Sequence, residues 1–330
     1  MIVAYEKVYE NAWDKFVMQE SINGNFLQTR NFLNYHKKGK FIDASILFLH
    51  EEEIAAVLPA NEIDDGKILI SHQGSTFGGL IVGEKYASSS NYDWIFSELI
   101  EYLKQKEYVT VELRMHHWLY SPKEKHNELL EYYFQLYGFR VRSEIGFFID
   151  LKQLSCDYIS NFEKLKKRKL NKAIKHNLRF IKLESDDQVM EFYGVLADNM
   201  CKFHTVPLHS LEELLEFKNK RLCDVVSFYG VYLEDKMIAG SMVFSFCDKK
   251  VFHTQYLASC HDYLNYCPNE FLYTNLIQKA IDEKYRFLSY GTASLDHGWK
   301  YNESLGMYKE GFNTDSYMNH CYIWGKENSR

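Results

Sequence analysis

The sequence is poor in proline and has no glycine- or serine-rich tract. It contains 4 Pro in 330 residues, so long flexible linkers are not expected. Its seven cysteines are scattered along the chain, and no C-x-x-C pair occurs among them. This pattern indicates neither a disulfide framework nor a zinc ribbon and is typical of reduced cytosolic thiols.

Long apolar runs and an excess of positive charge are missing as well. No segment approaches about 18 consecutive apolar residues, so no membrane-spanning helix is expected. The first residues, MIVAYEKVYENAWDKF, show no basic segment followed by an apolar core, and we expect no signal peptide. The net charge of -6 at pH 7 excludes a globally basic nucleic-acid binder, and no DNA partner is expected. Together these features predict a cytoplasmic protein.

Two stretches of the chain repeat one pattern. LIEYLKQKEYVTVEL, from Leu99, and LIQKAIDEKYRFLSY, from Leu276, each predict an amphipathic helix, a charged turn and an apolar strand. A hairpin-like pair of strands precedes each copy, and a helix ending in Gly-Phe follows it, at 138–139 and at 311–312. A repeat of this length indicates two similar domains rather than a solenoid, whose units are far shorter.

The order of elements in each half is hairpin, strand, helix, strand, helix, strand. Helices that alternate with strands predict an α/β (α+β) fold with a mixed sheet between helical layers. A length of 330 residues also suggests about two domains. We place them at 1–151 and 152–330, and the second includes a basic linker helix over 156–176.

A polar cluster interrupts an apolar strand of the second half. In strand geometry His253 and Gln255 share one face, and Thr254 and Tyr256 share the other. Polar groups in the middle of a sheet are unfavourable unless they are paired or used. A histidine that titrates near neutrality suits proton removal from an attacking amine or hydroxyl. The alternative is a polar cluster bonded within the sheet.

The segment HQGSTFGG leaves a strand of the first half with three glycines and several hydrogen-bonding side chains. Glycines allow the backbone to approach a ligand, and successive N–H groups form anion-binding nests. We assign donor or acceptor binding to His72, Gln73, Gly74 and Gly78. A tight turn or bulge is the alternative.

The segment HTVPLH carries His204 and His209. No carboxylate or cysteine joins them at metal-ligand spacing, so no metal site is expected. We assign both histidines to an acceptor pocket, with a helix-capping turn as the alternative.

After the strand over 287–290, Asp296, His297 and Lys300 lie where ligands bind in open α/β sheets, as candidates for an acid, a base or an anion contact. We assign Asp296 to donor or acceptor binding and Lys300 to an anion contact. A simple loop with incidental polarity is the alternative.

The predicted linker helix is strongly basic. Eight Lys or Arg and no acidic residue lie between Lys164 and Arg179. Such a run repels itself, and an anionic partner would offset that repulsion: CoA phosphates, a nucleotide-sugar or lipid diphosphate, or a tRNA backbone. Arg168 and Lys169 are its candidate contacts. A solvated surface helix is the alternative.

The order of elements resembles the GNAT acyltransferase fold, and its duplication resembles the FemABX-type proteins, more closely their FemAB-related acetyltransferase-like group. The resemblance rests on five segments and on the two Gly-Phe helix ends. The segments are SHQGSTFGG (71–79), KLKKRKLNKAIK (164–175), FHTVPLHSLEEL (203–214), IAGSMVF (238–244) and HTQYLAS (253–259).

The resemblance implies acyl or aminoacyl transfer to an amine or a hydroxyl, from a thioester or an aminoacyl-tRNA. In GNAT proteins a glycine-rich loop holds the CoA pyrophosphate, but the corresponding ASCHDYLNYCPNEF has no glycine. Met307 stands where those proteins have a tyrosine that protonates the leaving thiolate. Both departures leave the donor open.

We expect an enzyme that transfers an acyl group, acetyl first of all, from a CoA thioester to a small molecule or a cell-envelope or polysaccharide precursor. The sequence has no G-x-S-x-G elbow, so direct attack without a covalent enzyme intermediate is favoured. His253 would be the base, Tyr256 a positioning or acid group, and Lys300 an anion contact. The alternatives are an aminoacyl-tRNA-dependent transferase that acts on a peptidoglycan precursor and a non-catalytic protein that binds a precursor.

Overall fold

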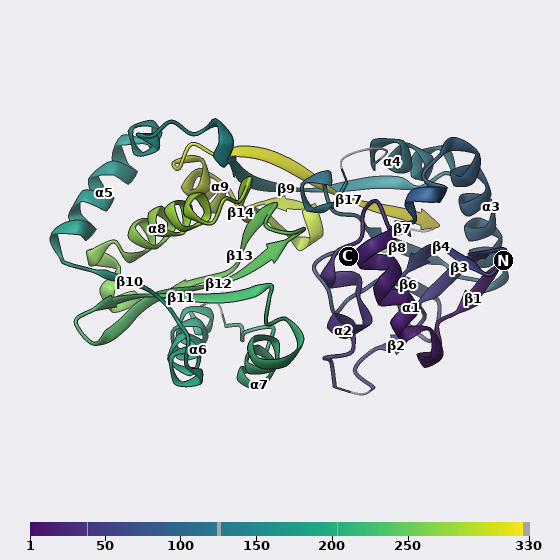
Figure 1. Cartoon of the computed structure of the whole chain (residues 1–330), viewed down its shortest axis with the longest axis horizontal. Coiled ribbons are helices and arrows are strands. Elements are labelled where there is room, and N and C mark those ends of the chain that lie inside the picture. Colours follow the sequence, from purple (N-terminus) through teal and green to yellow (C-terminus); the bar gives the residue numbers. More distant parts are fainter. Residues whose placement is uncertain (38, 124–126, 203, 326–330) are drawn as a thin grey trace. The chain divides into compact units, whose positions relative to one another are not determined.

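The computed structural model describes residues 1–37, 39–123, 127–202 and 204–325 (Figure 1). Phe203, the first residue of one segment that carries the family resemblance, lies outside them. The chain forms two compact units. Of the described residues, unit 1 comprises those of Met1–Glu144, Asp296–Trp299 and 318–325, and unit 2 comprises those of Ile145–Leu295 and Lys300–Tyr317. The predicted division at residue 151 assigns the C-terminal strand to the second domain, whereas residues 318–325 pack in unit 1.

Unit 1 contains two sheets. The first follows the order β17-β8-β6-β5-β2 and the second the order β1-β3-β4-β7. The only parallel pair among the described strands of this unit joins β6 and β8. The strands are β1 (Ile2–Ala4), β2 (Ile42–Asp43), β3 (Ile46–His50), β4 (Glu53–Leu58), β5 (Asn61–Ile63), β6 (Ile68–Ser71), β7 (Ile81–Val82), β8 (Thr110–Arg114) and the end of β17 (Asp315–Gly325).

Helices cover both faces of the β3–β4 hairpin because side chains alternate along a strand. Phe48 and Ala56 join the apolar cluster under α3 and α4. Leu47 and Val57 lie in a second cluster with Trp13. The helical segments of this unit are η1 (Lys7–Tyr9), α1 (Glu10–Lys15), η2 (Phe16–Glu20, π-helical), η3 (Phe26–Gln28), α2 (Arg30–Leu33), η4 (Glu84–Tyr86), α3 (Ser89–Gln105), η5 (Trp118–Tyr120), α4 (Asn127–Leu136) and η10 (Asp296–Gly298).

Unit 2 is built on a sheet of order β10-β11-β12-β13-β14-β9, and among its described strands only β13 and β14 pair in parallel. Strands β15 and β16 form a separate small hairpin. The strands are β9 (Arg140–Asp150, its larger part in this unit), β10 (Arg179–Lys182), β11 (Val226–Leu233), β12 (Lys236–Phe246), β13 (Val251–Ser259), β14 (Phe287–Thr292), β15 (Ser294–Leu295) and β16 (Lys300–Tyr301).

The sheet of unit 2 also lies between helical layers, with α8 on one face and α6 on the other (Figure 1). Leu272, Leu276 and Ile277 of α8 are buried in the main apolar cluster, and Phe192 of α6 packs on Phe228 from the other side. The helical segments are η6 (Leu151–Gln153), η7 (Tyr158–Asn161), α5 (Lys164–Lys175), α6 (Asp186–Cys201), α7 (Leu211–Glu216), η8 (Phe217–Arg221), η9 (His261–Tyr266), α8 (Pro268–Asp282) and α9 (Glu303–Glu310).

The two units repeat one order of elements, which confirms the duplicated α/β fold predicted from the sequence. The hairpin β3–β4, the parallel strands β6 and β8, and α3 between them correspond to β11–β12, β13 with β14, and α8. The basic helix α5 is shorter than predicted because Phe162 has an extended backbone (φ -65°, ψ 152°) and separates it from η7. None of the described helices combines the length and the apolar character needed to cross a membrane.

Candidate functional site

The parallel strands β13 and β14 separate halfway along their length. They pair only from Val251 to His253, against Phe287 to Ser289. Strand β13 then continues to Ser259 and β14 to Thr292. We call the region where the two strands part the strand fork. Beyond this point the backbone N–H and C=O groups of the two strands do not pair with each other, so they can form hydrogen bonds with a bound ligand.

A β-bulge lies on each arm of the strand fork. On β13, Met242 and Val243 of β12 face Tyr256 and Thr254, so Gln255 is the extra residue. On β14, Phe148 and Phe147 of β9 face Ser289 and Gly291, so Tyr290 is the extra residue. A bulge leaves the extra residue out of the ladder and redirects side chains, and bulges are frequent beside active sites.

His253 lies at the base of the strand fork in a polar network. Its Nδ1 is hydrogen-bonded to Ser289 Oγ at 3.0 Å, and its ring also interacts with the Gln255 side chain. Ser289 Oγ in turn accepts a hydrogen bond from the Gly291 N–H (3.1 Å). Burial, with a smaller contribution from the Lys309 charge, lowers the pKa of His253 to about 3. The imidazole is therefore neutral at pH 7 and weakly basic.

Tyr256 and His209 form a second polar pair on the β13 arm. The Tyr256 hydroxyl lies 2.6 Å from His209 Nδ1. Burial raises the pKa of Tyr256, so its hydroxyl keeps its proton and donates this bond. His209 is buried against the Phe217 ring, whereas His204 is exposed and lies outside the pair. The structure thus brings two sequence-predicted residues into contact and leaves His204 apart from them.

Lys309 of α9 contacts the end of β14 and was not among the residues predicted from the sequence. It is 3% exposed, and its ammonium donates to the carbonyl oxygens of Gly291 (3.1 Å) and Thr292 (2.6 Å) at the end of β14. Burial lowers the pKa of Lys309 to about 7. The sequence did hold a signal: Gly306, Lys309 and Phe312 recur every three residues, a spacing that puts the lysine on the apolar face.

Two tyrosine hydroxyls near the fork have no hydrogen-bond partner in the described part of the chain. They belong to Tyr290, the bulged residue of β14, and to Tyr308 of α9, and both oxygens are buried. The Tyr273 ring of α8 packs between them, 4.5 Å and 6.1 Å from the two rings. Buried polar groups are nearly always bonded, so each hydroxyl is a candidate partner for a water or for a polar atom of a ligand.

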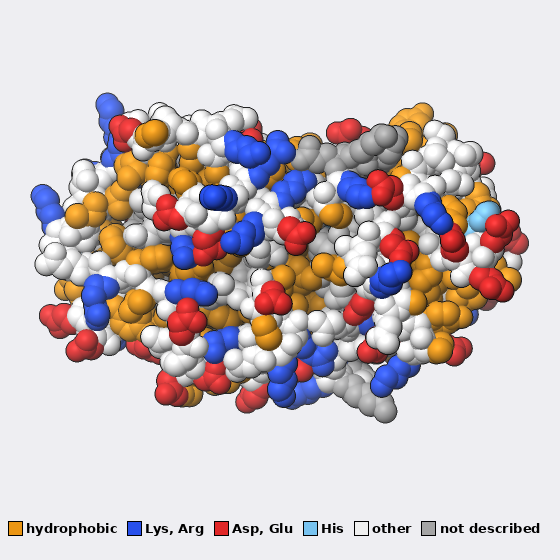
Figure 2. Space-filling model, viewed as in Figure 1, with side chains coloured by type: hydrophobic (Ala, Val, Ile, Leu, Met, Phe, Trp, Pro, Cys, Tyr) orange, Lys and Arg blue, Asp and Glu red, His pale blue; other side chains and the backbone are white. Residues whose placement is uncertain are grey.

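The basic helix α5 is only partly a solvated surface. Lys166 is buried over the Tyr308 ring, 3.1 Å from its centroid, and its ammonium lies 3.4 Å from Glu270. Lys169 approaches the same carboxylate at 3.2 Å. Burial lowers the pKa of Lys166 to about 8, and the Glu270 carboxylate opposes that shift. Arg168 is exposed. Lys and Arg side chains project at the left edge of the view in Figure 2, where Figure 1 places α5.

Glu270 also bears on the choice of donor. It is buried in the first turn of α8, within the last residues of the segment that the resemblance equates with the GNAT pyrophosphate loop. Helix N-termini attract anions through free N–H groups and the helix dipole. In unit 2 the Glu270 carboxylate itself lies in the first turn of α8, where an anionic ligand would otherwise bind.

The loop after β6 belongs to unit 1 and is closely packed. The Gly74 N–H donates to His72 Nδ1 (3.1 Å), and the Gly74 carbonyl lies 3.0 Å from His36 Nε2. Gln73 pairs with Asn61 through its backbone and its side chain. Gly78 lies so close to β6 that an added Cβ would be 2.3 Å from the Ser71 carbonyl oxygen. These glycines allow close backbone packing, and their role in ligand binding stays a prediction.

Gly74→Ala should destabilise the protein. The added Cβ would lie 1.9 Å from His36 Nε2, so we expect a loss of about 1–3 kcal/mol in unfolding free energy. The matched control is Gly194→Ala in α6, where nothing lies within 4 Å of the added carbon. That change should stabilise by about 0.5–1 kcal/mol because alanine favours the helix. The urea midpoints of the two variants measure both effects. Equal shifts of the midpoint in Gly74→Ala and Gly194→Ala would contradict the close packing of Gly74 against His36.

Asp296 and Lys300 lie on a short exposed excursion of the chain. Asp296 opens η10 with a left-handed backbone (φ 51°) and belongs to unit 1. Lys300 is exposed on β16 and belongs to unit 2. Their assignment to acceptor and anion contacts stays a prediction. Among the described residues, no group of three or more His, Cys, Asp or Glu is arranged to hold a metal ion.

Several solved structures share the fold of this chain. FemX superposes with a TM-score of 0.67 at 10% identity, over 98% of this chain and 96% of that one. A tandem GNAT protein from the clavulanic acid biosynthesis pathway gives 0.58 at 7% identity, over 100% and 99%. L-PGS from Bacillus licheniformis gives 0.57 at 12% identity, over 87% and 84%. No family model matches the sequence, and no curated protein does.

The fold of this chain is therefore a duplicated GNAT-like fold of the FemABX kind.

Proposed function

We propose that this chain, with a duplicated GNAT-like fold in common with FemX, transfers an acyl group from an activated donor to an amine or hydroxyl by direct attack. The observation that carries the proposal is the strand fork of unit 2, with a bulge on each arm and the buried Lys309 ammonium at the end of β14. The preferred donor is an acyl-CoA, acetyl-CoA first of all. The preferred acceptor is a small molecule or a cell-envelope precursor.

In the proposed reaction the donor carbonyl lies in the strand fork. The acceptor nitrogen or oxygen forms a bond to the carbonyl carbon, the oxygen gains negative charge, and the bond to the leaving thiolate then breaks. The backbone N–H of Gln255, the extra residue of the β13 bulge, and the Lys309 ammonium would stabilise that oxyanion. A low-dielectric setting strengthens such contacts, and Lys309 is buried.

The reaction also needs a proton to leave the attacking group and a proton to reach the thiolate. Tyr256 supports the second step because its phenol keeps a proton that it can transfer to the thiolate, while His209 positions the hydroxyl. The phenolate formed in this way would regain a proton from solvent. For the first step we keep His253 as the proposed base, although a pKa near 3 makes it weak. All seven cysteines are free thiols, which is compatible with a cytoplasmic enzyme.

Replacing His253 by alanine tests the base assignment. If the imidazole removes the proton, turnover should fall by about 100-fold or more. The imidazole also bonds Ser289, so far-UV and near-UV circular dichroism must show that the variant is folded. Ser289→Ala serves as the matched control because it removes the same hydrogen bond and keeps the imidazole. Unchanged turnover in His253→Ala would remove the assignment.

A second candidate is an aminoacyl-tRNA-dependent transferase that acts on a peptidoglycan precursor. Glu270 at the N-terminus of α8 favours it because a buried carboxylate there opposes the binding of a CoA pyrophosphate. The exposed cations of α5, Arg168 among them, would contact the tRNA backbone. Donor binding that weakens steeply between 50 and about 200 mM salt would support this candidate. Donor affinity that does not change with salt concentration would count against this candidate.

The third reading is a duplicated scaffold without catalysis that binds a precursor. The complete bonding of His253 within the sheet supports it, since Ser289 and Gln255 both contact the ring. Turnover of any acyl donor that depends on Lys309 would exclude it. Binding of a nucleotide sugar without any consumption of donor would support it.

A further inference from the structure

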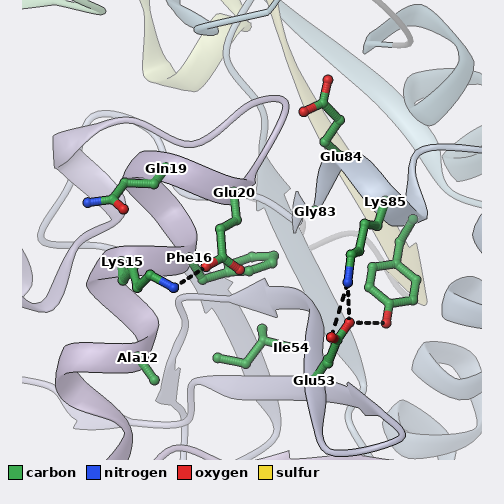
Figure 3. Close-up of a pocket in the computed structure, with 11 residues that line it drawn as sticks. Ala12, Lys15, Phe16, Gln19, Glu20, Glu53, Ile54, Gly83, Glu84 and Lys85 are labelled. Atoms are coloured by element: carbon green, nitrogen blue, oxygen red, sulfur yellow. Dashed lines mark hydrogen bonds and ion pairs between the residues drawn. The ribbon is translucent and has the colours of Figure 1, made fainter.

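A hollow on unit 1 is lined by residues to which the proposed reaction gives no role. It lies between η2 with the end of α1 on one side and β4 with η4 on the other (Figure 3). Its volume is about 530 Å³, well within the range of small-molecule sites. Its apolar lining includes Ala12, Phe16, Ile54 and Gly83, and the Tyr86 ring also lines it, with its hydroxyl donating to Glu53 (3.3 Å).

The walls of this hollow are fixed by backbone hydrogen bonds. The Ile22 N–H donates to the Val82 carbonyl and the Gly83 N–H to the Ala55 carbonyl, both at 2.9 Å. An added Cβ on Gly83 would lie 3.0 Å from the Phe16 ring, so glycine allows that ring to reach the floor. Segment η2 is π-helical, and single π-turns occur often at functional sites.

Two ion pairs face each other across the floor. Lys15 Nζ lies 2.7 Å from Glu20, and Lys85 Nζ lies 2.9 Å from Glu53. In the view of Figure 3 the Phe16 ring lies between the two pairs, and Glu84 points away from the space. Glu84 forms its own ion pair with Lys123, which does not line the hollow.

These ion pairs are easily exchanged for contacts with a ligand. All four side chains are about half exposed or more, from 47% for Glu20 to 74% for Lys85. Exposed pairs of this kind contribute little to stability, so little is lost when a partner is replaced. The two lysines and the two glutamates can therefore each exchange their present partner for a group of opposite charge on a ligand.

Charge balance decides which ligand fits. The charges of the two lysines and the two glutamates that face the floor sum to zero. A ligand with a single charge that replaces one member of an ion pair therefore leaves the other member without a partner. A ligand with both an ammonium and a carboxylate matches both signs, and an apolar stem would cover Phe16 and Ile54. We propose that this hollow binds a zwitterion of the amino-acid class with an apolar side chain, its ammonium at Glu53 or Glu20 and its carboxylate at Lys85 or Lys15.

Calorimetric titration of the full chain with three matched probes tests the proposal. L-leucine carries both charges, 3-methylbutylamine lacks the carboxylate, and 4-methylpentanoate lacks the ammonium. L-leucine should bind, and removing either charge should weaken binding at least tenfold because each charge-assisted contact is lost. No heat of binding for L-leucine up to about 10 mM, or equal binding of all three probes, would overturn the proposal.

Variants locate the binding. Glu53→Gln and Lys85→Met should each weaken L-leucine binding at least tenfold, and Ala12→Trp should block it by filling the space from α1. The matched control is Lys279→Met, which removes an exposed ion pair with Glu283 (2.9 Å) on α8. Equal weakening in that control would contradict the assignment. Lys309→Met should bind L-leucine as the unaltered chain does, so a failed acyl-transfer proposal and a failed zwitterion proposal give different results.

Discussion

Replacing Lys309 by methionine should lower turnover by about 100- to 1000-fold, the effect of removing one donor to a developing oxyanion. Methionine has a similar length and no charge, so the α9 packing around Phe312 is retained. The matched control is Glu310→Gln, an exposed neighbour on the same helix, which should leave turnover unchanged. Turnover in the methionine variant within a factor of three of the unaltered chain would refute the assigned role.

The pH dependence gives an independent readout for Lys309. Its pKa of about 7 is below the ordinary value because the site is buried. If the ammonium is the active form, turnover should decline as the pH rises through 7. Between about 7 and 10.4 the unfolded chain keeps a proton that the folded chain has lost, so stability should rise with pH over that window. The methionine variant should lack this rise, and an unchanged pH profile of stability would contradict the burial of the charge.

Acidification should destabilise the protein through the paired histidines of unit 1. The His36 and His72 rings are stacked at 6.2 Å, and both bond Gly74. Burial lowers the pKa of each to about 4. Between pH 6.5 and 4 the unfolded chain binds protons that the folded chain excludes, so stability falls as the pH falls. From pH 7 to 5 we expect a loss of about 2 kcal/mol from His72, and less from the more exposed His36.

Urea titrations at pH 7 and pH 5 measure this loss. His72→Asn should flatten the profile because its side-chain oxygen can accept the Gly74 N–H bond and does not titrate there. His261→Asn, at an exposed histidine of unit 2, is the control and should follow the unaltered chain. Equal urea midpoints at the two pH values would show that His72 is not held neutral by the fold.

The fold was largely predictable because its signals are local. The helix, turn and strand repeated from Leu99 and Leu276 appear as α3 with β8 and as α8 with β14. Hydrophobic periodicity within about 15 residues is enough to predict such elements. The start of α5 was not predictable in this way, since Phe162 takes an extended backbone in contact with Phe312, which is distant in sequence.

The site was only partly predictable because it depends on register and burial. Strand alternation predicted that His253 and Gln255 share a face, and their side chains do interact. The bulges at Gln255 and Tyr290 depend on pairing with β12 and β9, and no local pattern fixes that pairing. The contact of Tyr256 with His209 joins residues 47 positions apart.

The basic helix shows the same limit. Seven cations on α5 suggested a free charged face, yet the Lys166 ammonium is buried beside Glu270. A carboxylate more than 100 residues away along the chain cannot be assigned to a lysine from composition. Burial, and with it the shift of a pKa, is a property of the packed molecule.

The most direct test of acyl transfer at the strand fork is a measurement of donor binding and donor consumption. The full chain should be titrated calorimetrically with acetyl-CoA and, separately, with aminoacyl-tRNA, each against Lys309→Met and Tyr256→Phe. We expect one of these donors to bind the unaltered chain and to be consumed when an amine acceptor is present, and we expect both variants to slow its consumption. Binding of neither donor, or consumption that neither variant alters, would contradict it.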